Sequence, residues 1–272
     1  MPALRQAKPY YTVKGTAQQI AHVEQSVQMY SVVLDKLIRN VTHDQGNSGP
    51  SLLMLSDHAY GSALLSWFVR RDLAAMRQWL YTTARLDQMY YQRIEDRGRA
   101  LNKAWRLLYP LVSNHPGMTQ WFAGCDEIYD LKRVEYVRTW DYLGYQAPLA
   151  LRGDWNRLAR RSQAAIDYLR ATKSKVRYLA DQEFFLALAR QDRPSMEVAL
   201  ERLTQPKLIR SRINDEHGFA ENLISTPAVV YAKIAWLHGH EVKVDSPLVP
   251  AEWLLMKPLP HYEEAYAFLA ST

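Results

Sequence analysis

The fold is decided by the stretch from residue 64 to 86, which reads LLSWFVRRDLAAMRQWLYTTARL. An apolar segment ends at two arginines, and Asp72 then opens a second segment whose apolar residues recur every three or four positions. Aspartate is a favoured helix N-cap because its carboxylate accepts hydrogen bonds from the unpaired amides of the first turn. The stretch therefore predicts two helices joined by a tight antiparallel turn.

The same arrangement recurs further along the chain. Asp154 follows APLALRG and Asp192 follows FLALARQ, so the three aspartates are separated by 82 and 38 residues. A further break, NHPG at 114–117, falls near the middle of the longer gap. Units of about 40 residues are the size of one helix–turn–helix repeat. We predict an all-α fold of stacked antiparallel helical hairpins, similar to a helical-repeat array.

Apolar spacing predicts helices over most of the chain. We expect a single all-α domain, residues 1–272, with an N-terminal helical bundle at 16–112 and C-terminal hairpins at 118–269. The longest stretch without clear periodicity is 204–226, and long irregular loops often carry function. The expected helices are 16–41, 51–70, 72–93, 97–112, 118–123, 126–140, 154–169, 174–189, 194–203, 227–237 and 261–270.

Composition excludes several classes of protein. Hydrophobic residues make up 48% and charged residues 23% of the 272 positions, as in ordinary globular proteins. A single cysteine, Cys125, excludes an internal disulfide, and its acidic neighbours would raise the thiol pKa, so we interpret it as structural. No apolar run reaches about 18 residues, and the first residues lack an apolar signal core. We expect a cytoplasmic protein without a membrane span.

Two residue groups have the chemistry of a catalytic or metal site but an unfavourable spacing. Adjacent helical residues point about 100° apart, so Asp57 and His58 fit a polar pair in the core better than an acid–base pair. His238, His240 and Asp245 have metal-ligand side chains, but a helix-ending glycine separates the histidines and a fourth ligand is missing. Phosphate-binding loops, nucleophile elbows and dinucleotide fingerprints are absent from the sequence. We predict no enzyme activity, metal or cofactor; a hydrolase using Asp57, His58 and a distant acid is a remaining alternative.

Two segments carry a family resemblance. They read SLLMLSDHAYGSALLSWFVRRDLAAMRQWLYTTARLDQMYY (51–91) and PAVVYAKIAWLHGHEVKVDSPLVPAEWL (227–254). Together they resemble the all-α immunity proteins of bacterial polymorphic-toxin and type VI secretion systems. The resemblance implies a cytoplasmic protein that binds and neutralises a cognate toxin effector, and such helical families are often paired with nucleases. It implies no particular binding residues, because each inhibitory surface is specific to its toxin.

A nuclease partner predicts local negative charge on the inhibitor. A nuclease presents a positive groove to its substrate, so a complementary acidic patch would steer association and fix orientation. Tyr129, beside the acids of 126–130, would serve as an interface anchor. The carboxylates of 126–130 would also stabilise a helix start, so a structural role remains an alternative for them. The candidate residues are Asp215, Glu216, Asp126, Glu127, Asp130 and Tyr129.

The basic balance of the chain supports a second functional hypothesis. The net charge is +6, and the chain contains eight tryptophans and seventeen tyrosines. A helical-repeat nucleic-acid-binding protein would have such a composition, and its binding would depend steeply on salt. Against this hypothesis, the basic residues are scattered, and most of them alternate with apolar positions, as is typical of solvated helix faces. They include Arg160, Arg161, Lys173, Lys175, Arg177 and Arg212.

Overall fold

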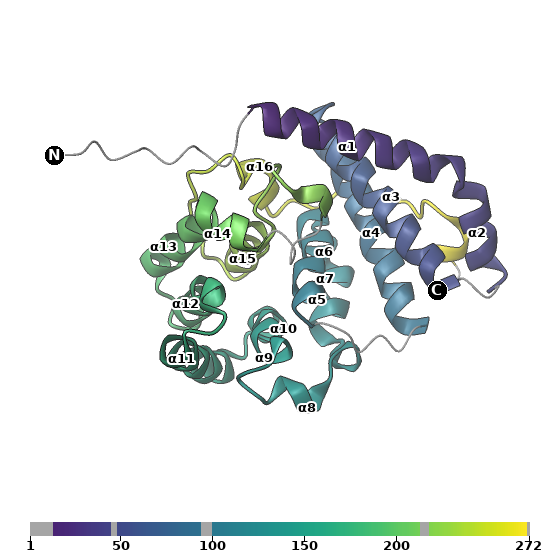
Figure 1. Ribbon diagram of the computed structural model, residues 1–272. Coiled ribbons are helices and arrows are strands. Elements are labelled where there is room, and N and C mark those ends of the chain that lie inside the picture. Colours follow the sequence, from purple (N-terminus) through teal and green to yellow (C-terminus); the bar gives the residue numbers. More distant parts are fainter. Residues whose placement is uncertain (1–12, 45–47, 94–99, 213–217, 271–272) are drawn as a thin grey trace.

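The computed structural model describes residues 13–44, 48–93, 100–212 and 218–270 (Figure 1). Within these ranges every regular element is an α-helix or a short 3-10 helix, and no strand is formed. The predicted all-α class is confirmed.

The first four helices build one side of the molecule (Figure 1). The antiparallel pair α3 and α4 forms the most extensive helix–helix contact, and α1 and α2 pack against α3. The helix predicted for 16–41 is divided at Val33, whose backbone φ of −106° and ψ of 7° leave the helical region. The bounds are Val13–Val32 for α1, Leu34–Thr42 for α2, Ser48–Phe68 for α3 and Leu73–Arg93 for α4.

Short helices form the middle of the chain. They are α5 (Ala100–Arg106), α6 (Leu108–Ser113), α7 (Pro116–Gly124), the 3-10 helix η1 (Asp126–Ile128), α8 (Leu131–Val134), α9 (Trp140–Gly144) and α10 (Gln146–Arg152). The prediction of one continuous helix over 126–140 is wrong. The Val134 carbonyl, which would accept an intrahelical bond, instead accepts one from Arg161 at 2.8 Å. The Thr139 hydroxyl donates to the Arg133 carbonyl at 2.7 Å and accepts from the Tyr142 amide at 3.0 Å, which closes the turn before α9.

The C-terminal half continues as an array in which α11 packs on α12 and α12 on α13 (Figure 1). Its elements are α11 (Trp155–Thr172), η2 (Val176–Tyr178), α12 (Leu179–Ala189), α13 (Arg193–Leu203), α14 (Pro206–Ser211), η3 (Gly218–Ala220), α15 (Thr226–Leu237), α16 (Ala251–Leu254) and η4 (Ala267–Leu269). The helix predicted from Ser174 begins only at Leu179, because Lys173 and Lys175 both have a φ of 54° and turn the chain. The helix predicted for 261–270 is reduced to η4.

Three aspartates lie between consecutive helices and cap the N-terminus of the second one, as their recurrence in the sequence predicts. The carboxylate of Asp72 accepts from the Ala75 amide at 2.9 Å, and that of Asp154 accepts from the Arg157 amide at 3.3 Å. Asp192 accepts from the Ser195 amide at 3.2 Å. The residue before each aspartate has a positive φ, between 55° and 71°. The amides of Asp154 and Asp192 bond back to carbonyls five residues earlier, as in a Schellman motif.

Apolar contacts join the two halves of the chain. The main hydrophobic cluster contains residues from Val23 to Leu254, and a smaller one lies under α2, α3 and α4. Tyr266 and Leu269 belong to this smaller cluster, so the C-terminal segment returns to the N-terminal helices (Figure 1). The division into an N-terminal bundle and C-terminal hairpins stays a prediction.

Candidate protein-binding surface

The predicted acidic and aromatic segment at 126–130 connects α7 to α8, and the structure gives its members different surroundings. Glu127 is exposed, whereas Asp126 and Asp130 are partly buried. Tyr129 is only 4% exposed and belongs to the main core. Asp215 and Glu216 lie outside the described residues. The structure therefore brings together three of the five predicted acids.

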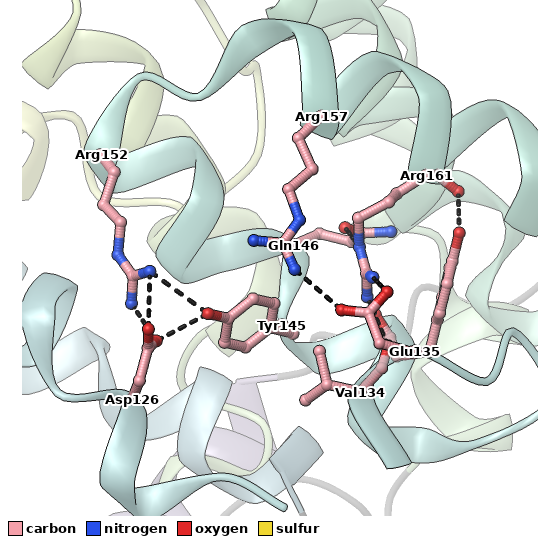
Figure 2. A network of polar contacts seen from close by, with 9 residues as sticks. Asp126, Val134, Glu135, Tyr145, Gln146, Arg152, Arg157 and Arg161 are labelled. Carbon is pink, nitrogen blue, oxygen red and sulfur yellow. Dashed lines mark hydrogen bonds and ion pairs between the residues drawn. The ribbon is translucent and has the colours of Figure 1, made fainter. Parts of the chain in front are cut away.

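The carboxylate of Asp126 is fixed to helix α10 (Figure 2). It accepts a hydrogen bond from the Tyr145 hydroxyl at 2.6 Å and forms an ion pair with Arg152. Burial alone would raise the pKa of Asp126. The hydrogen bonds from Arg152 and Tyr145, together with the nearby guanidinium charges, outweigh burial and lower this pKa. Asp126 thus stays ionised, but Arg152 offsets much of its charge.

Asp130 and Tyr129 have clear structural roles. The Asp130 carboxylate caps α8, because it accepts from the amides of Lys132 at 3.1 Å and Arg133 at 3.2 Å. The Tyr129 ring packs edge-on against Tyr145, with the ring centroids 5.2 Å apart. Its burial places Tyr129 beneath the surface, where it supports Tyr145 and has little area to offer a partner. Glu127 is the acid of this segment with the most exposed charge.

A second set of contacts holds the α8–α9 connection against α11 (Figure 2). Arg161 is 6% exposed, and its guanidinium lies 3.9 Å from the centroid of the Tyr142 ring. It donates to the Val134 carbonyl at 2.8 Å and to the Gln146 side chain at 3.2 Å. Glu135 is shared by Arg161, at 3.3 Å, and Arg157 of the preceding turn, at 2.8 Å. Burial is the main reason that the pKa of Arg161 is lowered, while Tyr142 and Glu135 partly oppose this shift.

The sequence does not predict this network. The prediction of solvated helix faces does not hold for Arg161, because its guanidinium is buried between α8, α9 and α10. It does not hold for Arg212 either, whose side chain is only 1% exposed. The spacing of Arg157 and Arg161, one helical turn apart, is the only sequence signal of a shared contact. Such a pair usually lies in solvent, and only the tertiary structure shows otherwise.

The other candidate groups do not converge on a reaction centre. His58 Nε2 lies 3.3 Å from the Ser31 hydroxyl, whereas Asp57 interacts with Tyr30, so the two neighbours have separate partners. Burial lowers the pKa of His58. His238 packs edge-on against Trp155 at 4.6 Å. Among the residues that the structure describes, no three His, Cys, Asp or Glu side chains are placed to hold a metal ion.

Two further observations bear on chemistry and location. Burial, and after it the interaction with Glu127, raises the pKa of the Cys125 thiol to about 11, which agrees with a structural cysteine. None of the described helices combines the length and the apolar composition needed to cross a membrane.

Comparison with known protein families gives a match within the region just described. Residues 119–253, about half of the chain, match the model of a family described as immunity protein 49. The matched region starts in α7 and ends in α16, so it contains the network of Figure 2 and the turns at Asp154 and Asp192. No curated protein and no solved structure matches the chain. The match confirms the predicted resemblance to all-α immunity proteins.

Proposed function

From the membership of residues 119–253 in the immunity protein 49 family, we infer that this chain binds a cognate toxin directly and thereby neutralises it. The family match is the observation that carries the inference. Neutralisation by binding requires a complementary surface and no reaction centre. The chain therefore acts as a non-enzymatic inhibitor, and the toxin is a secreted effector such as those of polymorphic-toxin or type VI secretion systems.

The rigidity of the matched region supports inhibition by direct contact. Ion pairs and hydrogen bonds tie the segment from 126 to 146 to α10 and α11 (Figure 2). A surface that is already ordered loses less conformational entropy when it binds. Leu131 and Tyr136 are 53% and 58% exposed on this segment. Aromatic and apolar side chains of this kind commonly form the centre of protein interfaces.

The toxin in this proposal is a nuclease. Glu127 and the exposed part of Asp126 present negative charge before α8, and we name these two residues the acidic rim. Asp215 and Glu216, which lie outside the described residues, are further acidic candidates by sequence. A substrate groove that binds phosphates is positive, so such carboxylates would orient the inhibitor over it. Tyr129 contributes by holding Tyr145 in place under this acidic rim.

Co-expression tests the proposal. The protein encoded by the neighbouring reading frame is produced in bacteria with and without this chain. We expect growth arrest by that protein alone, rescue by the chain, and recovery of both in one complex from the rescued cells. Growth arrest that the chain does not relieve would contradict the proposal. Rescue without a complex would contradict direct binding.

A further inference from the structure

Two interhelical connections meet at one corner of the array and form a basic surface. One connection leads from α8 to α9, and the other leads from α11 to η2, near the labels α8, α9 and α11 in Figure 1. Lys175 joins them, because its ammonium group donates to the Arg138 carbonyl and lies 4.1 Å from the centroid of the Trp140 ring. The Trp140 patch, as we name this surface, consists of Tyr136, Arg138, Trp140, Lys173, Lys175 and Arg177.

The positive charge of three cations in the Trp140 patch is poorly compensated. Among the described residues, Arg138, Lys173 and Lys175 form no ion pair. The neighbouring Asp141 is 2% exposed and is bound by Arg133 at 2.9 Å. Burial, and then the charge of Arg133, lowers the pKa of Lys175, while the Asp141 carboxylate partly opposes this shift. Like charges are thus held close together here, which is unfavourable in the free protein and is relieved when an anionic group binds.

Lys173 and Lys175 belong to the same turn of the backbone. Lys173 and Lys175 both have a φ of 54°, in the left-handed region that non-glycine residues rarely adopt. Strained backbone of this kind is often found at binding sites. Lys173 is exposed, and the Arg177 guanidinium lies 6.0 Å from the centroid of the Trp140 ring.

The apolar members of this corner favour a protein partner over a nucleic acid. Tyr136 is 58% and Val176 46% exposed, and such side chains among arginines are typical of protein interfaces. Single-stranded nucleic acids bind by stacking bases on open aromatic faces. Lys175 covers a face of Trp140, and Tyr178 packs edge-on against this ring at 4.9 Å. Trp140 is therefore not an open stacking platform.

We propose that the Trp140 patch is the docking site for a carboxylate-rich surface of the toxin, an inference that rests on the proposed function. In the chain, the acidic rim at 126–127 precedes α8, and the patch begins at Tyr136, after Glu135. The Glu135 carboxylate is itself paired with Arg157 and Arg161. Regions of opposite charge before and after one short helix would fix the orientation of a partner that carries a positive and a negative region in matching positions. The whole patch lies within the region that matches the immunity protein family.

The chemistry of the patch is tested with two polyanionic probes, fluorescein-labelled poly-L-glutamate and a single-stranded RNA of equal charge. The full chain is compared with the double variant Arg138→Glu/Lys173→Glu. The matched control is Lys36→Glu/Arg39→Glu, which makes the same charge change at exposed positions of α2. We expect the patch variant to bind poly-L-glutamate about tenfold more weakly by fluorescence anisotropy and the control to differ by about twofold at most. Thermal unfolding verifies that both variants fold.

Two results with these probes would overturn the proposal. Equal losses of affinity for poly-L-glutamate in the patch and control variants would show that binding depends on net charge alone. Tighter binding of the RNA than of poly-L-glutamate, with the loss confined to the patch variant, would make a nucleic acid the occupant.

Binding measurements with the protein encoded by the neighbouring reading frame distinguish a failure of this proposal from a failure of the proposed function. If the patch variant binds that protein more weakly and the control variant binds it normally, both the docking site and the immunity function are supported. Binding that neither variant alters would overturn the docking site and leave the immunity function intact. If the unaltered chain does not bind that protein, the immunity function fails, whereas the poly-L-glutamate result still decides the chemistry of the patch.

Discussion

Asp181 and Arg212 form a two-bonded ion pair in the protein core, with nitrogen–oxygen distances of 2.8 and 3.0 Å. Both side chains are at most 2% exposed. The Tyr231 hydroxyl donates to the same carboxylate at 2.7 Å, and the Arg212 guanidinium lies 4.6 Å from the Tyr178 ring. The pair thereby joins α12 to α15 and to the residue after α14, within the region matched by the immunity protein family.

Removal of one partner from this pair should destabilise the protein strongly. Asp181→Ala leaves the Arg212 charge buried without its carboxylate, and we expect the free energy of unfolding to fall by about 3–5 kcal/mol. Asp181→Leu/Arg212→Met, which removes both charges, should recover most of this loss. Urea unfolding measures both. The control is Arg170→Ala, which breaks an exposed ion pair with Glu183 and should change stability by about 1 kcal/mol or less. Similar losses for Asp181→Ala and the control would contradict this account.

Lys233 should make the stability depend on pH. This side chain is fully buried, and burial, followed by the charge of Arg77, lowers its pKa from 10.5 to about 7. Between these two values the unfolded chain holds a proton that the folded chain has released. The free energy of unfolding therefore rises with pH from about 7 to about 10.5, and below pH 7 the destabilising contribution is fully present.

The variant Lys233→Met isolates this contribution. Other ionisable groups titrate in both proteins, so the difference between wild-type and variant stability is measured by urea unfolding at several values between pH 7 and pH 10. We expect the wild-type protein to gain stability relative to the variant across this interval. A difference that stays constant with pH would show that Lys233 keeps an ordinary pKa.

The aspartate turns should contribute stability and not binding. Asp154→Ala should lower the free energy of unfolding by roughly 0.5–2 kcal/mol, because it removes a helix N-cap, and Asp192→Ala should also lower it. Asp167→Ala, at an exposed position inside α11, is the matched control and should have a smaller effect. Affinity for the toxin should be retained by both cap variants. Loss of toxin binding with unchanged stability in Asp154→Ala would refute the capping role.

These turns also show what the sequence can predict. A cap is a local interaction between an aspartate and the next turn, so the three hairpins follow from sequence alone. The prediction of one helix over 126–140 is wrong because Arg161, more than twenty positions away, donates a hydrogen bond to the Val134 carbonyl. Likewise, the burial of Tyr129 depends on its contact with Tyr145. Periodicity contains no information on such distant contacts.

The acidic rim should govern the rate of toxin association. Charge reversal of Glu127 to Lys, and of Asp215 and Glu216 to Lys, should slow association with a nuclease toxin, most strongly at low salt. Dissociation should change less. Surface plasmon resonance at two ionic strengths measures both rates, and Glu252→Lys, exposed on α16, is the control. Unchanged association rates in all these variants would exclude the predicted acidic residues from the binding mechanism.

Titration calorimetry between this chain and the purified protein encoded by its neighbouring reading frame tests the central claim most directly. The same samples are assayed for cleavage of DNA and RNA. The account predicts saturable binding, with nuclease activity lost in proportion to complex formed and no cleavage by the chain alone. Absence of binding, or full nuclease activity in the saturated mixture, would contradict neutralisation by direct contact.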